Sequence, residues 1–170
     1  MAFIIRNPIA GTTDIYSVDD AQRLPLGTEV QAWDGAFGGA TFVYCKGVAS
    51  LTTANAVLIN QDDWTTVRAV AGLIGKIGFS MSAPTASQFG WFQLTGKTIC
   101  KTSGAFADNA NCYLTASASA VGSSIVAGDR IKNMKGASAG GTTTTSNGVG
   151  ITNSAEMEID RPFTDAGLAA

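Results

Sequence analysis

Apolar and polar residues alternate along much of the chain with a period of two, which is the pattern of a half-buried β-strand. Glycine pairs and short polar runs separate the alternating stretches, and helical periodicity is scarce. Repeated short strands joined by turns predict an all-β fold, either a compact antiparallel β-barrel or a jelly-roll-like sandwich. The strands are expected at residues 28–33, 41–49, 55–60, 64–70, 76–81, 89–100, 104–107, 112–116 and 151–160, with another after a turn at 127–131.

The stretch 89–100 is the one around which the other strands are expected to be organised, because it carries large apolar residues on both parities. Trp91 and Phe92 are adjacent, so in a strand they face opposite sides of the sheet. Such a strand is either enclosed between two sheets or covered on one side by another chain. Gly90 and Gly96 predict a bulge, a bend or a close approach of the backbone. Trp91 is therefore either a core residue or a contact residue for a partner subunit.

The chain divides into three parts by pattern. Residues 1–27 are punctuated by proline and glycine and lack the apolar periodicity needed to fold alone, so we expect an extended N-terminal arm that wraps its own domain or reaches a neighbour. Residues 28–160 are expected to form the barrel or sandwich, and 161–170 a surface tail. The Gly/Ser/Thr-rich run 136–150 has almost nothing to bury and predicts a flexible loop.

Charge is sparse in this sequence. The 170 residues suffice for one domain with its own core, and only 14% of them are charged, well below the usual quarter. A net charge of −2 argues against nucleic acid or an anionic membrane as a partner. Arg6 interrupts the apolar run at the N-terminus too early for a signal peptide, and no stretch has the apolar length of a membrane span. A charge-poor surface suits a protein that is largely covered by partners, a secreted protein or a virion protein.

The sequence contains no histidine, which removes the Ser-His-Asp and Cys-His nucleophile systems, histidine metal sites and histidine bases. Gly90 and Gly96 are separated by five residues where a phosphate loop needs four, and they lie in a strand pattern. Asp62 and Asp63 are adjacent, so they would face opposite sides of a strand and not act on one atom. We therefore expect no enzyme activity and no cofactor.

The best carboxylate cluster lies in the last expected strand, where Glu156, Glu158 and Asp160 share one parity. Three carboxylates on one face can bind a divalent cation. The simpler interpretations are an exposed strand kept soluble by charge, or ion pairs with the basic residues of 130–135. No metal site is assigned.

The three cysteines, Cys45, Cys100 and Cys112, are an odd number without metal-ligand spacing. Because nothing indicates export, buried reduced thiols are expected. A Cys100–Cys112 bridge across a hairpin is the alternative.

Three segments in the same order, residues 26–32, 38–49 and 86–96, carry a likeness to a known group of proteins, the last of them with Phe89-Gly90-Trp91-Phe92 at its centre. They resemble small virion structural proteins of tailed bacteriophages, which are often head decoration, or cement, proteins. The likeness spans about residues 26–127 and consists of core strands and turns.

The resemblance implies a non-enzymatic protein on the outer surface of the virion capsid, made in the host cytoplasm. Its partners would be the major capsid protein and itself, commonly as a homotrimer at local three-fold positions and sometimes as a dimer. It would bridge capsid subunits and stabilise the head lattice. The residues expected to make these contacts come from the arm, the organising strand and the acidic row: Phe3, Ile4, Ile5, Tyr16, Trp91, Glu156, Glu158 and Asp160.

Other classes of function are also compatible with the sequence. A tail- or fibre-associated virion protein could bind a host receptor or glycan, for which Trp33, Trp64 and Trp91 would have to form an exposed platform. A hydrolase would have to use Asp62, Asp63 or Glu156, and a head–tail connector would normally carry more charge or helix.

Overall fold

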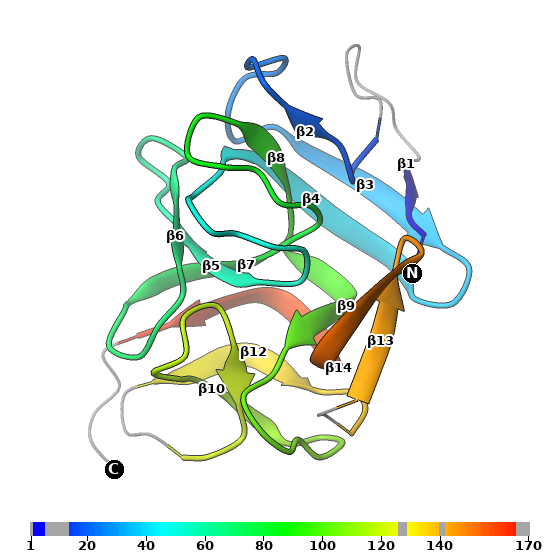
Figure 1. The fold of residues 1–170 in the computed structure, drawn as a ribbon, viewed down its shortest axis with the longest axis vertical. Coiled ribbons are helices and arrows are strands. Elements are labelled where there is room, and N and C mark those ends of the chain that lie inside the picture. The colour runs from blue at the N-terminus through cyan, green and yellow to red at the C-terminus, as the bar shows by residue number, and fades with distance from the viewer. Residues whose placement is uncertain (1, 6–13, 126–128, 140–141, 166–170) are drawn as a thin grey trace.

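The computed structural model describes residues 2–5, 14–125, 129–139 and 142–165. These residues form strands and turns and contain no helix, so the all-β prediction is confirmed (Figure 1). The strands are β1 (Ile4–Ile5), β2 (Val18–Asp19), β3 (Glu29–Asp34), β4 (Gly38–Lys46), β5 (Ala56–Ile59), β6 (Thr66–Arg68), β7 (Gly75–Ser80), β8 (Phe89–Gln93), β9 (Thr95–Lys101), β10 (Asn111–Leu114), β11 (Val121–Gly122), β12 (Arg130–Gly136), β13 (Thr142–Ser146) and β14 (Val149–Thr164).

All the strands belong to one antiparallel sheet that is not closed into a barrel and agrees with the sandwich alternative. Its main path runs β1-β3-β4-β8-β7-β14-β12-β10-β11, and the remaining strands pair at its sides. Figure 1 shows β1, β3, β4 and β8 in the upper half of the molecule and β10, β12 and β14 in the lower half. One apolar cluster packs among β7, β9, β10, β12 and β14, and two others lie on opposite faces of the β4–β8 pair.

The β4–β8 pair lies at the centre of the upper half and is buried on both faces. Tyr44 lies opposite Trp91 on one face, and Val43 lies opposite Phe92 on the other. Each of these four side chains is almost fully buried, the first two in one apolar cluster and the last two in another. The strand around Trp91 is therefore enclosed within the chain itself.

The predicted strand 89–100 is broken into two strands at Leu94. Just after the break, Gly96 has a φ of +88°, and a Cβ added to it would lie 2.5 Å from the carbonyl oxygen of Gly39. The close backbone approach expected at Gly96 is thus present, and it places the start of β9 against β4. The prediction of a strand at 104–107 is wrong, because this segment is irregular and leads into a turn.

The last strand, β14, joins both halves of the molecule. It pairs with β13 near its start, with β9 and β12 along its middle, and with β7 at its end. A bulge interrupts its pairing with β12, and Arg161 in this bulge has a φ of 47°. The sheet therefore includes residues 161–164, which the sequence analysis assigned to the tail.

The prediction of a flexible loop at 136–150 is partly wrong, since this run contains β13 and the start of β14. Asn147 and Gly148 have positive φ values of 47° and 77° and connect Ser146 to Val149, which pair with each other. These are the angles of a type I′ turn, for which Asn-Gly is the preferred sequence.

Candidate functional site

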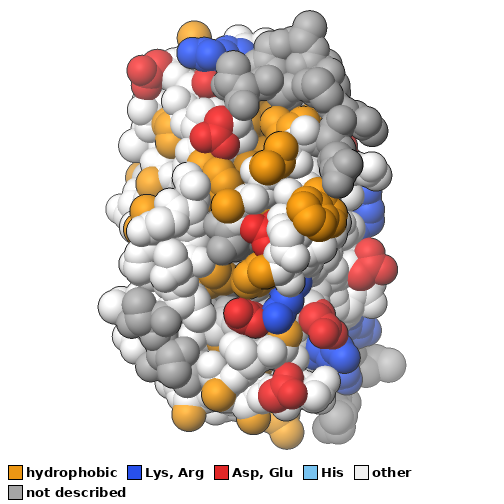
Figure 2. Space-filling view, turned by 90° about the vertical axis from the view of Figure 1, so that its right-hand side faces the viewer, with side chains coloured by type: hydrophobic (Ala, Val, Ile, Leu, Met, Phe, Trp, Pro, Cys, Tyr) orange, Lys and Arg blue, Asp and Glu red, His pale blue; other side chains and the backbone are white. Residues whose placement is uncertain are grey.

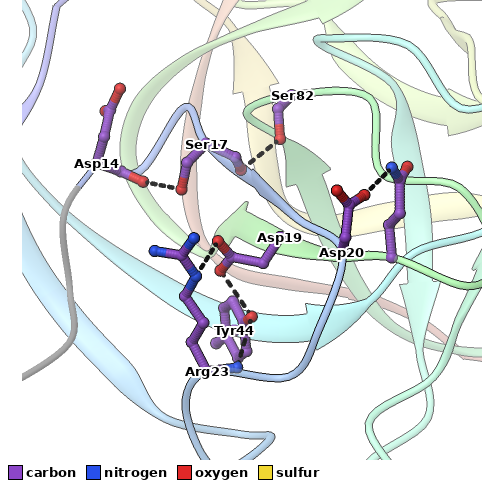
Figure 3. A network of polar contacts seen from close by, with 8 residues as sticks. Asp14, Ser17, Asp19, Asp20, Arg23, Tyr44 and Ser82 are labelled. Carbon is purple, nitrogen blue, oxygen red and sulfur yellow. Dashed lines mark hydrogen bonds and ion pairs between the residues drawn. The ribbon is translucent and has the colours of Figure 1, made fainter.

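Figure 3 shows a network of polar contacts that holds the N-terminal segment against the domain. The hydroxyl of Tyr44 donates to Oδ2 of Asp19 at 2.8 Å, and Nε of Arg23 lies 3.1 Å from Oδ1 of the same carboxylate. Burial and the hydrogen bond to Asp19 raise the pKa of Tyr44 to about 12. The phenol of Tyr44 therefore stays protonated, and both oxygens of the Asp19 carboxylate are already bound. These contacts hold the N-terminal segment in place.

Two further side-chain contacts of the same network reach the loop between β7 and β8. The amide of Gln88 donates to Oδ1 of Asp20 at 2.7 Å, and the hydroxyl of Ser82 donates to the carbonyl of Ser17 at 3.2 Å. Between them, β2 pairs with β8. The N-terminal segment, which was expected either to wrap its own domain or to reach a neighbour, is thus bound to its own domain at residues 17–23.

The first strand, β1, is also tied to this domain. Its pairing with β3 places Ile4 opposite Trp33 and Ile5 opposite Ala32. The backbone N–H of Phe3 donates to the hydroxyl of Tyr16 at 3.1 Å. Phe3 is 5% exposed and meets the ring of Phe42 edge-on, with 5.1 Å between ring centroids.

Asp34 fixes both the start of the chain and the β3–β4 turn. Its carboxylate accepts the backbone N–H of Ala2 through Oδ2, and those of Ala36 and Phe37 through Oδ1 at 2.8 Å each. Burial by itself would raise the pKa of this carboxyl, but the three N–H groups outweigh burial and hold the pKa below its usual value. Asp34 therefore stays ionised and keeps the first residues in place.

These contacts correct the expectation for the predicted interface residues of the arm and organising strand. Phe3 and Trp91 are 5% and 2% exposed, so neither is available to a partner in this conformation. Ile5 and Tyr16 are half-buried against the same cluster, and only Ile4 is well exposed, at 69%. The apolar face at Trp91 is covered by the N-terminal segment and not by another chain.

The acidic row of β14 lies on the surface as expected, but two of its members are used within the chain. Glu156 forms an ion pair with Lys97 at 2.5 Å, and Glu158 one with Lys135 at 3.0 Å. Asp160 is exposed. No group of three or more potential metal-binding side chains occurs in the described part of the chain.

Asp62 and Asp63 lie in the turn before Trp64 and have local roles. Oδ1 of Asp63 accepts the backbone N–H of Thr65 at 3.1 Å and its hydroxyl at 2.8 Å, and these bonds lower the pKa of this exposed carboxyl. The backbone N–H of Asp62 donates to the side chain of Asn60. The carboxylate of Asp63 and the backbone N–H of Asp62 thus stabilise this turn.

The three cysteines are free and buried, as the sequence analysis expected. Burial raises the pKa of Cys45 and Cys112 to about 12, and raises that of Cys100 well above its usual value. The thiol of Cys112 lies 4.0 Å from the sulfur of Met157 in the lower core. None of the three is a candidate nucleophile, because the thiolate form is strongly disfavoured.

The three tryptophans do not form a common platform. Trp91 lies in the core, and Trp33 is 43% exposed at the end of β3. Trp64 is partly buried, and Nζ of Lys76 lies 5.8 Å from the centre of its ring. Figure 2 looks onto the side of the molecule where β1 and the end of β3 lie, and hydrophobic side chains reach the surface there in several places.

Two surface features were missed by the sequence analysis, because each joins strands whose neighbours alternation does not reveal. One is an apolar groove of about 360 Å³ whose apolar lining includes Leu58, Val67, Leu73 and Ile74. The other is a hollow of about 330 Å³ beside Trp33, between β3, β4 and the β8–β9 corner.

Comparison of the chain with protein-family models, with curated proteins and with solved structures returns no match. Within the described residues, no helix is long and apolar enough to cross a membrane.

Proposed function

We propose that this protein is a virion structural protein of the head decoration type, which binds the outer capsid surface and stabilises the lattice by bridging major capsid protein subunits. The observation that carries this proposal is the apolar groove, defined by Leu58, Val67, Leu73 and Ile74. Exposed apolar surface rimmed by polar residues is typical of a protein–protein contact site.

The groove is open because of its local structure. Leu58 of β5 lies directly opposite Val67 of β6, and Ile74 precedes β7. Val67 and Ile74 are 53% and 58% exposed. Gly75 makes room, since a Cβ there would lie 3.3 Å from Cδ2 of Leu58. Of the side chains that line the groove, only Lys76 is charged.

Further support comes from the small number of charged residues, from the absence of histidine in the sequence, and from the resemblance of the core strands to phage decoration proteins. A chain with 14% charged residues and no histidine offers little for acid–base chemistry or nucleic-acid binding. A homotrimer, the expected assembly, would present three grooves to the lattice at once. Modest single contacts then give tight attachment through effective concentration.

The test combines light scattering with co-sedimentation of the protein with purified capsids. We expect an oligomer that sediments with capsids, and Val67→Asp and Ile74→Asp should each weaken this binding more than tenfold. Ile125→Asp is the matched control, because Ile125 is 84% exposed but lies outside the groove. A monomer that ignores capsids would contradict the proposal, as would equal binding by all three variants.

A further inference from the structure

The outer face of β12 and β14 carries both signs of charge in a chain that has few charged residues. The exposed residues of β12 include the basic Arg130, Lys132 and Lys135, and those of β14 include the acidic Glu158 and Asp160. The two strands pair with each other in the lower half of the molecule (Figure 1). A basic row therefore lies beside an acidic row on one surface.

Most of these charges are neutralised within the chain. Glu158 lies directly opposite Lys135, and Nζ of Lys135 is 3.0 Å from Oε2 of Glu158. Lys132 forms an ion pair with Asp165, just beyond the end of β14. Opposite charges on neighbouring strands of a sheet attract each other, so these pairs support the register of β12 on β14.

Two charges on this face have no opposite charge bound to them. Nη2 of Arg130 donates to Oδ1 of Asn111 at 3.0 Å, and this amide is a neutral partner. Asp160 is next to Arg161, but the guanidinium of Arg161 donates through both terminal nitrogens to the carboxylate of Glu29. Neither Arg130 nor Asp160 forms an ion pair within the part of the chain that the structure describes.

Arg130 and Asp160 border the same hollow, which has a volume of about 450 Å³. Register shifts interrupt the pairing of β12 with both β10 and β14 around Asn133, which has a φ of 57°. Such bulges redirect side chains at the surface of a sheet. The buried side chains of Met134 and Ile159 also line the hollow. One basic and one acidic group are thus presented around a single recess.

A second copy of this chain fits that combination of charges. A surface with one unpaired basic group and one unpaired acidic group is complementary to itself. Across a two-fold axis, when Arg130 of one copy meets Asp160 of the other, the reverse contact forms as well. A simple anion would neutralise only Arg130, and a cation only Asp160. We propose that two copies of the chain associate about a two-fold axis through the outer face of β12 and β14, with reciprocal ion pairs between Arg130 and Asp160.

The strength of this contact follows from its chemistry. Exposed ion pairs contribute little while water surrounds them, and salt screens them. Association removes water from this face, which strengthens the attraction. Phe163 adds apolar surface, since it is 37% exposed and lies opposite Lys132, with Nζ of this lysine 6.0 Å from the centre of its ring. The dimer should therefore depend on protein concentration and weaken as salt is raised.

This face is distinct from the proposed capsid-binding groove, because the groove and the hollow share no lining residue. Of the two assemblies that the resemblance implies, a two-fold contact fits the dimer, which would carry two grooves. Self-association is measured without capsids. A wild type that stays monomeric and still sediments with capsids would overturn this inference and leave the proposed function standing.

The experiment is sedimentation equilibrium of the full chain over a range of protein concentrations, in about 50 mM and about 500 mM salt. We expect a monomer–dimer equilibrium that shifts toward monomer at the higher salt. Arg130→Asp and Asp160→Arg each create two like-charge contacts in a dimer and should raise its Kd at least about tenfold, or about 1.4 kcal/mol. Asp62→Arg is the matched control, because Asp62 is exposed in a turn away from this face.

Restoration of the contact tests its two-fold symmetry. The double variant with Arg130→Asp and Asp160→Arg exchanges the two charges and should recover a dimer. An equal mixture of the two single variants should also form dimers, each holding one chain of each kind, because both contacts then join opposite charges. Recovery in the mixture shows as well that both variants are folded. A monomeric or trimeric wild type, equal association by all variants, or no recovery in either case would overturn the proposal.

Discussion

Truncation of Ile15 tests whether the N-terminal segment is part of the core of its own chain. Ile15 is fully buried in the cluster that also contains Phe42, Tyr44 and Trp91. Ile15→Ala removes three buried carbon groups, which at about 0.8 kcal/mol each amounts to about 2.4 kcal/mol before any cavity forms. With the cavity included, we expect a loss of about 3 to 4 kcal/mol in the free energy of unfolding. This is a large part of the roughly 5 to 15 kcal/mol that stabilises an ordinary domain.

The assay is urea unfolding followed by tryptophan fluorescence, to which the buried Trp91 contributes. Ile4→Ala is the matched control, since Ile4 lies on the same N-terminal segment but is 69% exposed. It should change the free energy of unfolding by less than about 0.5 kcal/mol. Equal effects of the two substitutions would refute the placement of Ile15 in the core.

Light scattering distinguishes a segment bound to its own domain from one exchanged between subunits. A segment that packs on its own chain leaves the oligomeric state of Ile15→Ala the same as that of the wild type at each protein concentration. If the segment were exchanged, Ile15→Ala would weaken the contact between subunits and favour dissociation. Dissociation of the folded variant at concentrations where the wild type stays assembled would contradict the intramolecular contacts of Ile15.

Three other predictions concern single residues. The pKa of Asp34 is lowered in the folded protein, so its stabilising contribution should be complete above the unfolded pKa of about 3.9 and should be lost as the pH falls through the lower folded pKa. Urea midpoints measured between about pH 5 and pH 2 should show this loss in the wild type and not in Asp34→Asn. Gly148→Ala should destabilise the β13–β14 hairpin by about 1 kcal/mol, because φ is 77° there, and amide exchange should quicken in β13; unchanged exchange would exclude the type I′ turn. The thiols of Cys45, Cys100 and Cys112 should resist a thiol reagent in the native protein and all react in urea, whereas fast labelling of any of them under native conditions would contradict its burial.

The fold class was predictable because alternation records which side chains are buried, and burial is what a β-sheet imposes on a sequence. The pattern around Trp91 and Phe92 correctly indicated two apolar faces. It could not indicate what covers each face, because alternation carries no information about which segment packs there. Ile15 and Leu24, which cover the Trp91 face, lie in a stretch too irregular to show a strand pattern.

The Thr-rich run shows the opposite limitation. Composition alone predicted a loop, since threonine and glycine bury little. Local conformational preference was the better guide, because threonine favours strands and Asn147-Gly148 favours a two-residue hairpin turn. The groove and the hollow at Trp33 could not be predicted, since each depends on strands that are distant in sequence and adjacent only in the fold.

The pairing of β14 also has a consequence for the time course of folding. Its partners β7, β9 and β12 all precede it in the chain, and its residues Ala155, Met157 and Ile159 complete the lower core. During synthesis, that core stays open until β14 has left the ribosome. Contacts of such long sequence separation are slow to form, because much chain entropy is lost before they stabilise the fold. Until then the apolar faces of β10 and β12 stay exposed, and this interval is when the chain is most vulnerable to aggregation.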